Sequence, residues 1–336
     1  MRGLGLGRQA WHTKAMADTA GVQLEAYDFP SHYADLPEGR IHYLDEGQGP
    51  VLLMLHGNPT WSFLYRHLVR GLRDRFRCIA VDHLGFGLSD KPATGDYTIP
   101  GHIRRMEQLV DALGLERVTP VVQDWGGPIG LTWAVEHRAR VDRLVVMNTF
   151  AFNVRPADVT LSMLLAPLVL GVVRLPGVGE VLIRRLNIFV RRFVPGVIQD
   201  PARKTPGVMR GYLFPYPDYT SRAAILQFPR EIPFTSRHPN WMLLANLEAK
   251  LRGWQLPALI VWGQRDPAFA PSITDRFAAL LPNHRIVRIE HAGHFLQEEA
   301  PEAIIEAIGS FFEDRGVPAG GREPEAPRPP SARPEQ

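Results

Sequence analysis

Four short segments of the chain carry polar side chains of reactive types, and each segment follows directly on an apolar run. They are Leu55–Trp61, Val122–Gly127, Val261–Asp266 and His291–His294. Functional residues of open α/β sheets gather at the carboxyl ends of the strands. We therefore expect the four segments to meet at one edge of a sheet and to form a single active site.

The second segment, Val122-Gln-Asp-Trp-Gly-Gly127, has the form of a nucleophile elbow, a sharp strand-to-helix turn that exposes one side chain. Asp124 stands where a serine is usual. Gly126 and Gly127 are the small residues that such a turn needs, although Val122 occupies a position where glycine is commoner. A carboxylate in this place can attack a carbon that bears a leaving group and form an ester with the enzyme.

Hydrolysis of such an ester requires a base, and His294 is the candidate. Asp266 would hold the imidazole in one tautomer and stabilise the imidazolium ion, as the acid of a serine triad does. The order nucleophile, acid, histidine is the chain order of α/β hydrolases. His291 is a weaker candidate for the base because it lies earlier in the chain, nearer the strand.

Each of these residues also has a structural interpretation when it is taken singly. Asp124 could cap the following helix, Asp266 precedes a proline in a turn, and His294 could be a core histidine. Their arrival in order at the ends of three separate strands favours the catalytic interpretation. His291, His294 and Glu298 lack the H-E-x-x-H pattern of a metal site, and the glycine-rich segments at 3–7 and 85–90 fail as dinucleotide-binding loops. We expect neither a metal nor an organic cofactor.

The elements that must position these residues alternate in type along the chain. Short apolar runs are typical of strands buried on both faces of a largely parallel sheet, and the longer segments between them have helical spacing. This alternation predicts an α/β doubly wound sheet. The predicted strands are Ile41–Asp45, Val51–Leu55, Arg77–Val81, Val118–Gln123, Leu144–Met147, Ala258–Trp262 and Ile286–Ile289. The predicted helices are Trp61–Asp74, Ile103–Leu113, Pro128–His137 and Ala300–Phe312.

The alternation is interrupted by a long segment of helical character, which predicts a domain inserted between two halves of one sheet. The expected organisation is an N-terminal extension at 1–20, a first core part at 21–150, a helical cap at 151–253, a second core part at 254–315 and a proline-rich tail at 316–336. The extension and the tail carry too little patterned apolar surface to order themselves, and we expect both to be disordered.

The composition excludes several classes of protein. The 336 residues are 45% hydrophobic and 22% charged, and 38 basic against 35 acidic side chains give a net charge of +3 with no basic stripe that would indicate nucleic-acid binding. One cysteine rules out a disulfide framework. No signal peptide is recognisable, and the charge-free run Val159–Val173 is too short to span a membrane. We expect a cytoplasmic protein without nucleic-acid or membrane partners. The sequence is compatible with a homo-oligomer.

Four motifs together resemble the haloalkane dehalogenases: His56–Arg66 (HGNPTWSFLYR), Asp82–Asp90 (DHLGFGLSD), Gln123–Gly127 (QDWGG) and Ala292–Phe295 (AGHF). The resemblance extends over about residues 27–312 and is weak across the cap. It implies an α/β-hydrolase fold with a helical cap and an active site between cap and sheet. It also implies that Asp124 attacks a small apolar haloalkane and that a halide ion leaves.

The resemblance assigns the halide-binding donors and the acid as well. The family holds the halide with two N–H donors, and here Trp125 and Asn58 match these positions, since no tryptophan occurs in the cap between Trp133 and Trp241. The alternative position for the acid is Asn148, which cannot act as a carboxylate. The combination is similar to the third dehalogenase subfamily. Taken alone, Asn58 could simply form a turn and Trp125 could pack in the core.

Other functions use the same core, because a fold does not determine a reaction. An epoxide hydrolase would need cap tyrosines, for which Tyr212, Tyr216 and Tyr219 are available. A β-lactone decarboxylase of olefin biosynthesis would use Asp124 to open a cis-3-alkyl-4-alkyloxetan-2-one. A receptor or scaffold with a retained hydrolase pocket is the non-enzymatic alternative, and a complete triad argues against it.

Overall fold

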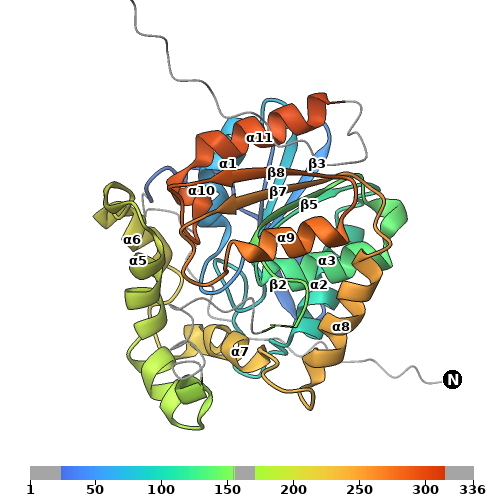
Figure 1. Ribbon diagram of the computed structural model, residues 1–336. Coiled ribbons are helices and arrows are strands. Elements are labelled where there is room, and N and C mark those ends of the chain that lie inside the picture. The colour runs from blue at the N-terminus through green and yellow to red at the C-terminus, as the bar shows by residue number, and fades with distance from the viewer. Residues whose placement is uncertain (1–23, 154, 156–170, 315–336) are drawn as a thin grey trace, which may run out of the picture.

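A mostly parallel eight-stranded sheet forms the centre of the protein, with strand order β1-β2-β4-β3-β5-β6-β7-β8 (Figure 1). The computed structural model describes residues 24–153, 155 and 171–314. The strands are β1 (His32–Leu36), β2 (Gly39–Glu46), β3 (Val51–Leu55), β4 (Arg77–Val81), β5 (Thr119–Asp124), β6 (Leu144–Thr149), β7 (Ala258–Gly263) and β8 (His284–Ile289). Among these strands only β2 is reversed: it pairs antiparallel with β1 and with β4, and every other neighbouring pair is parallel. The α/β-hydrolase fold predicted from the sequence is confirmed.

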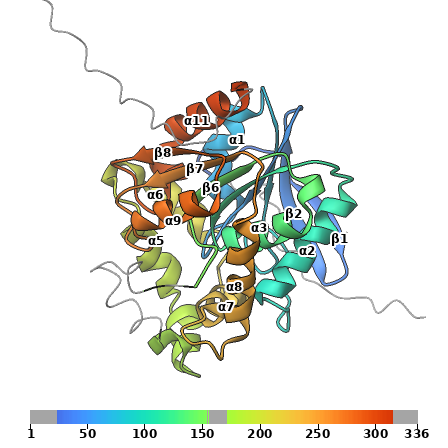
Figure 2. The ribbon, with the colours of Figure 1, turned by 45° about the vertical axis from the view of Figure 1, so that its right-hand side comes forward.

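Helices cover both faces of the sheet, as the two views show (Figures 1 and 2). α1 and α11 pack together on one face, while α2, α3 and α8 form the layer on the other, and α9 contacts β7 and β8. The core helices are α1 (Arg66–Leu72), α2 (Ile99–Ala112), α3 (Gly126–Glu136), α8 (Pro239–Leu251), α9 (Ser272–Leu280), α10 (Leu296–Glu299) and α11 (Pro301–Glu313), with the short turns η1 (Ser62–Tyr65) and η2 (Arg138–Arg140).

The local sequence explains where these elements begin and what they bury. The central strands β5, β6 and β7 are buried at every position, as expected for strands covered on both faces. α2 begins at Ile99 because the Thr98 hydroxyl accepts a hydrogen bond from the Gly101 N–H, which caps the first turn. α11 buries Ile304, Ile308 and Phe311 at helical spacing against the sheet side.

The segment between β6 and β7 contains the helices of the predicted cap. They are η5 (Glu180–Arg185), η6 (Phe189–Phe193), α5 (Val194–Val197), η7 (Pro201–Arg203), α6 (Pro206–Leu213), η8 (Thr220–Arg222) and α7 (Ala223–Glu231). They lie to one side of the sheet, at the left and bottom of Figure 1. α8 falls inside the predicted cap range 151–253, yet it packs against α3 as part of the core layer.

Parts of the sequence interpretation lie outside the described residues. These are the expected disordered extensions at 1–20 and 316–336 and most of the apolar run Val159–Val173. In the parts of the chain that the structure describes, no helix has both the length and the apolar character needed to cross a membrane.

Candidate active site

The structure brings Asp124, His294 and Asp266 together at the carboxyl ends of β5, β8 and β7. His294 Nδ1 lies 2.9 Å from Asp266 Oδ2, and His294 Nε2 lies 3.9 Å from Asp124 Oδ2. All three residues are buried. A carboxylate only accepts hydrogen bonds, so Nδ1 of His294 carries a proton toward Asp266 and Nε2 faces Asp124. This is the arrangement of a nucleophile, a base and an acid that orients the base.

Asp124 occupies a sharp turn between β5 and α3. Its φ angle is +49°, in the left-handed region that a residue other than glycine seldom adopts. The Thr149 hydroxyl donates to the Asp124 carbonyl oxygen and ties the turn to β6. The Asn58 N–H donates to Asp124 Oδ1 at 2.7 Å. The elbow therefore presents the carboxylate to a backbone donor from the loop after β3.

Burial raises the pKa of the Asp124 carboxyl above its ordinary value. His294 and the backbone N–H groups of Asn58 and Trp125 offset only part of this increase. Burial alone would lower the pKa of His294, but Asp266, Asp124 and Glu299 together raise it. The site therefore binds a proton more readily than the isolated side chains would.

The two glycines of the elbow are needed for close packing. A Cβ at Gly126 would overlap the Leu55 carbonyl oxygen, and one at Gly127 would overlap the Thr149 hydroxyl. We expect Gly126→Ala to reduce the free energy of unfolding by roughly 1–3 kcal/mol, because backbone cannot move aside as a flexible side chain can. Urea unfolding followed by circular dichroism measures this loss.

Gly253→Ala is the matched control for that measurement, since the nearest atom to its added Cβ lies 3.7 Å away. We expect the control to unfold at nearly the wild-type urea concentration. Equal unfolding midpoints for Gly126→Ala and wild type would show that the elbow tolerates a side chain.

Asp266 is held in place by the loop that follows β7 and by a side chain near the end of β6. Its Oδ1 accepts hydrogen bonds from the backbone N–H groups of Ala268 and Phe269, at 2.6 and 3.1 Å. Its Oδ2 accepts one from the Asn148 amide at 2.6 Å. Asn148, at the alternative position for the acid, is thus a hydrogen-bond donor to Asp266. His291 is exposed and makes none of these contacts.

Asn58 and Trp125 flank the Asp124 carboxylate. Asn58 Nδ2 donates to the Ile225 carbonyl of α7 at 3.1 Å, so one of its two N–H groups is engaged with the cap. The Trp125 ring stacks on Phe228 of α7 at 4.9 Å and meets the edge of Phe150. Within the described residues no acceptor is paired with the Trp125 indole N–H, which leaves it available to an anion.

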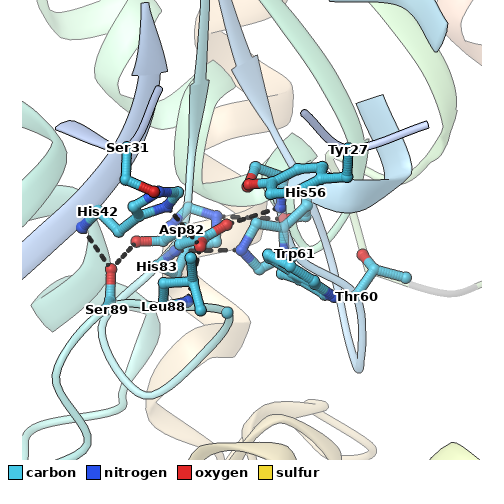
Figure 3. Close-up of polar contacts among 12 residues, drawn as sticks. Tyr27, Ser31, His42, His56, Thr60, Trp61, Asp82, His83, Leu88 and Ser89 are labelled. Carbon is cyan, nitrogen blue, oxygen red and sulfur yellow. Dashed lines mark hydrogen bonds and ion pairs between the residues drawn. The ribbon is translucent and has the colours of Figure 1, made fainter. Parts of the chain in front are cut away.

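A buried polar network that the sequence analysis did not assign supports the loop of Asn58 (Figure 3). Asp82 Oδ1 accepts from the Ser62 N–H at 2.6 Å, and Oδ2 accepts from the Leu88 N–H and from His42 Nδ1, both at 2.8 Å. Asp82 is fully buried. Although burial alone would raise its pKa, His42 and the Leu88 N–H hold the pKa below its ordinary value.

His56 belongs to the same network and opens the loop. Its Nδ1 donates to the Gly57 carbonyl at 2.8 Å, and its Nε2 accepts from the His83 N–H at 3.1 Å (Figure 3). Burial lowers the pKa of His56 to about 4, so the ring is neutral at neutral pH. The only sequence signal for His56, Asp82 and His83 is their place in the motifs that follow β3 and β4.

Buried carboxylates connect the cap to the segment that carries His294. Glu298 forms a two-point ion pair with Arg66, at 2.6 and 2.8 Å, and accepts from the Tyr212 hydroxyl of α6 at 2.8 Å. Glu299 accepts from the Gly293 N–H at 2.7 Å and from the Asp200 N–H of the cap at 2.8 Å. The cap is thereby bound to α10, which follows the loop of His294, and Glu299 also holds that loop through the Gly293 N–H.

The cap tyrosines do not point into the site. The Tyr212 hydroxyl is bound to Glu298, and the Tyr216 hydroxyl donates to the Thr60 carbonyl at 3.3 Å. Tyr219 is exposed and lies against Arg184. None of these three hydroxyls contacts Asp124, which removes the feature that an epoxide hydrolase would need.

Comparisons with known proteins identify the family of the chain. Residues 50–168 and 190–301 match the family model of the alpha/beta hydrolase fold. "Haloalkane dehalogenase 2" of Mycobacterium tuberculosis is 42% identical over 289 residues, which cover 86% of this chain and 96% of the relative. "Cis-3-alkyl-4-alkyloxetan-2-one decarboxylase" of Xanthomonas campestris pv. campestris is 36% identical over 299 residues, covering 85% and 97%.

Solved structures give the same result. The crystal structure of the haloalkane dehalogenase DatA from Agrobacterium tumefaciens superposes with a TM-score of 0.78 at 28% identity, covering 88% of this chain and 99% of that one. DbeA from Bradyrhizobium elkani, also a haloalkane dehalogenase, gives a TM-score of 0.77 at 28% identity, covering 85% and 98%. Fold, matched model and relatives together establish that this chain belongs to the haloalkane dehalogenase family of α/β hydrolases.

Proposed function

We propose that the protein is a hydrolase that cleaves the carbon–halogen bond of a small apolar haloalkane through an ester of Asp124. The observation that carries the proposal is the Asp124 carboxylate, which accepts the Asn58 N–H at 2.7 Å and faces His294 Nε2 at 3.9 Å. The relatives named haloalkane dehalogenase support the choice of substrate class. The cytoplasmic location expected from the sequence remains a prediction.

In the first step, the Asp124 carboxylate attacks the carbon that carries the halogen. A carbon–oxygen bond forms, the carbon–halogen bond breaks, and the halide leaves with the bonding electron pair. The developing negative charge needs oriented donors, because a buried site offers it little water. The Trp125 indole N–H and the Asn58 amide N–H supply these donors.

In the second step, His294 takes a proton from water while the water oxygen attacks the ester carbonyl of Asp124. Asp266 stabilises the imidazolium ion that forms. The backbone N–H groups of Asn58 and Trp125 hold the oxyanion of the tetrahedral intermediate. Collapse of this intermediate releases the alcohol and restores the Asp124 carboxylate. The products are an alcohol, a halide ion and a proton.

A β-lactone decarboxylase is the second candidate, and the relative from Xanthomonas campestris supports it. Asp124 would then open a cis-3-alkyl-4-alkyloxetan-2-one, and an alkene and carbon dioxide would be released. The two reactions are separated by incubating purified protein with 1-bromobutane, 1,2-dibromoethane and a cis-dialkyl β-lactone. Bromide release supports dehalogenation, whereas alkene formation without bromide release supports decarboxylation.

We expect Asn58→Ala to weaken halide binding about tenfold or more. We also expect it to slow cleavage of the carbon–halogen bond by roughly 10²–10³, because one of two donors to the leaving ion is lost. The backbone N–H of residue 58 stays in place, so the oxyanion donor is retained. Chloride quenching of tryptophan fluorescence measures the binding, and bromide release measures the rate.

Asn283→Ala is the control, since the Asn283 amide binds the Gln255 carbonyl at the surface. We expect it to bind chloride as the wild type does. Unchanged chloride quenching in Asn58→Ala would remove the Asn58 side chain from the halide site.

A further inference from the structure

The side chain of Gln123 contacts His294 in a way that the reaction described above does not use. Gln123 directly precedes Asp124 on β5 and is fully buried. Its amide nitrogen Nε2 lies 3.2 Å from His294 Nε2 and 3.2 Å from the His294 carbonyl oxygen. The residue next to the attacking carboxylate therefore touches the ring atom that must accept a proton.

The surroundings determine which atom of the amide faces the ring. A carbonyl oxygen can only accept a hydrogen bond, so the group beside the His294 carbonyl must be the NH2 of Gln123. A rotated amide would place its oxygen against another oxygen. Among the described residues, Gln123 Oε1 is buried without a hydrogen-bond partner, so the orientation of the amide rests on its contact with the His294 carbonyl.

The same contact determines the protonation state that the amide favours. His294 Nδ1 donates to Asp266 at 2.9 Å, so Nε2 of the neutral ring carries a lone pair. The Gln123 N–H donates to that lone pair before the reaction, and it must release the lone pair when Nε2 takes the proton from water. A protonated ring would present a second hydrogen to the amide donor, and the two would repel each other.

The charged groups around His294 act in the opposite direction. Asp266 lies after β7, Asp124 ends β5 and Glu299 lies on α10, and all three favour the imidazolium form. Burial of the ring favours the neutral form. A protonated His294 cannot serve as a base, so a device that favours the neutral ring is needed beside three carboxylates.

We propose that Gln123 is a positioning residue that keeps His294 in the neutral Nδ1–H form and so ready to act as a base. The inference rests on the proposed role of His294 in ester hydrolysis. Gln123 acts through His294, whose ring and backbone carbonyl its amide contacts.

The test is an NMR titration of His294 in wild type, Gln123→Met and Gln123→Glu, with ¹⁵N-labelled histidine. The chain has 12 histidines, and comparison with His294→Ala identifies the resonance. Methionine has the shape of glutamine without the donor, so we expect it to raise the pKa of His294 by about 0.5–1 pH unit. A carboxylate accepts from the protonated ring, and Gln123→Glu should raise the pKa by roughly 1–3 pH units.

Ester hydrolysis measured in a single turnover should follow the same order. The pH below which the rate of ester hydrolysis falls should be higher in Gln123→Met than in the wild type, and higher still in Gln123→Glu. Gln108→Met, on α2, is the matched control and should leave both the titration and this pH unchanged. A merely structural role for Gln123 would alter stability without this ordered change.

An unchanged or lowered pKa of His294 in folded Gln123→Met overturns the proposal. If that variant does not fold, the wild-type spectrum decides, because a ring that carries its proton on Nε2 rather than Nδ1 at neutral pH also overturns it. The titration needs no substrate. A protein that releases no halide but shows the ordered pKa change supports the role of Gln123 and contradicts the dehalogenase proposal alone.

Discussion

The Asp124→Ala protein is expected to release no measurable bromide from 1-bromobutane, a loss of roughly 10⁴-fold or more relative to the wild type. The carboxylate is the only group at the elbow that can form the ester, so neither His294 nor the halide donors can replace it. The elbow itself should survive, since Asp124 is held there by the Thr149 hydroxyl through its backbone carbonyl.

Two further variants separate chemistry from folding in this experiment. Asp124→Asn keeps the shape of the side chain but removes its charge, and we expect it to be inactive as well. Asp275→Asn changes an exposed carboxylate on α9 and should leave the rate unchanged. Bromide release by Asp124→Ala at a rate near that of the wild type would rule out covalent catalysis by this residue.

The His294→Ala protein is expected to form the ester with 1-bromobutane and then stop. Attack by Asp124 needs no base, whereas hydrolysis of the ester does. One equivalent of bromide should be released, and the intact mass should increase by one butyl group. Mass spectrometry of the protein after incubation measures this increase.

The double variant Asp124→Ala/His294→Ala should show no increase in mass, because it has no nucleophile. His291→Ala should turn over normally, since His291 is exposed and outside the site. An unmodified mass for His294→Ala that has released bromide would mean that the halide is displaced without a covalent intermediate.

Much of the fold could be predicted because parallel strands have a simple sequence pattern. The predicted strands Val51–Leu55 and Arg77–Val81 match β3 and β4, and both are apolar along their length. β1, at His32–Leu36, was missed because it is a half-exposed edge strand with no continuous apolar run. The apolar spacing predicts a start of α2 at Ile103, four residues late, because the helix begins at the cap that Thr98 provides and not at its first patterned apolar residue.

The site could be predicted only where its residues stand at strand ends. Asp124, Asp266 and His294 were found because each follows an apolar run, and their catalytic roles remain proposals. Gln123 and Glu299 were given no role, because each acts through a contact with a distant part of the chain. Glu299, for example, binds Asp200 of the cap, a pairing that no local pattern indicates.

The anchors between cap and core limit how new specificities can be engineered into this scaffold. A chimera that receives a foreign cap would lose the Tyr212–Glu298 and Asp200–Glu299 contacts. The loop of His294 would then lose the support that these contacts give to α10. Grafts that keep residues 199–216 and replace only the segment before them retain these contacts. Residues 171–198 are therefore the described part of the cap that a graft can replace without breaking either of these two contacts.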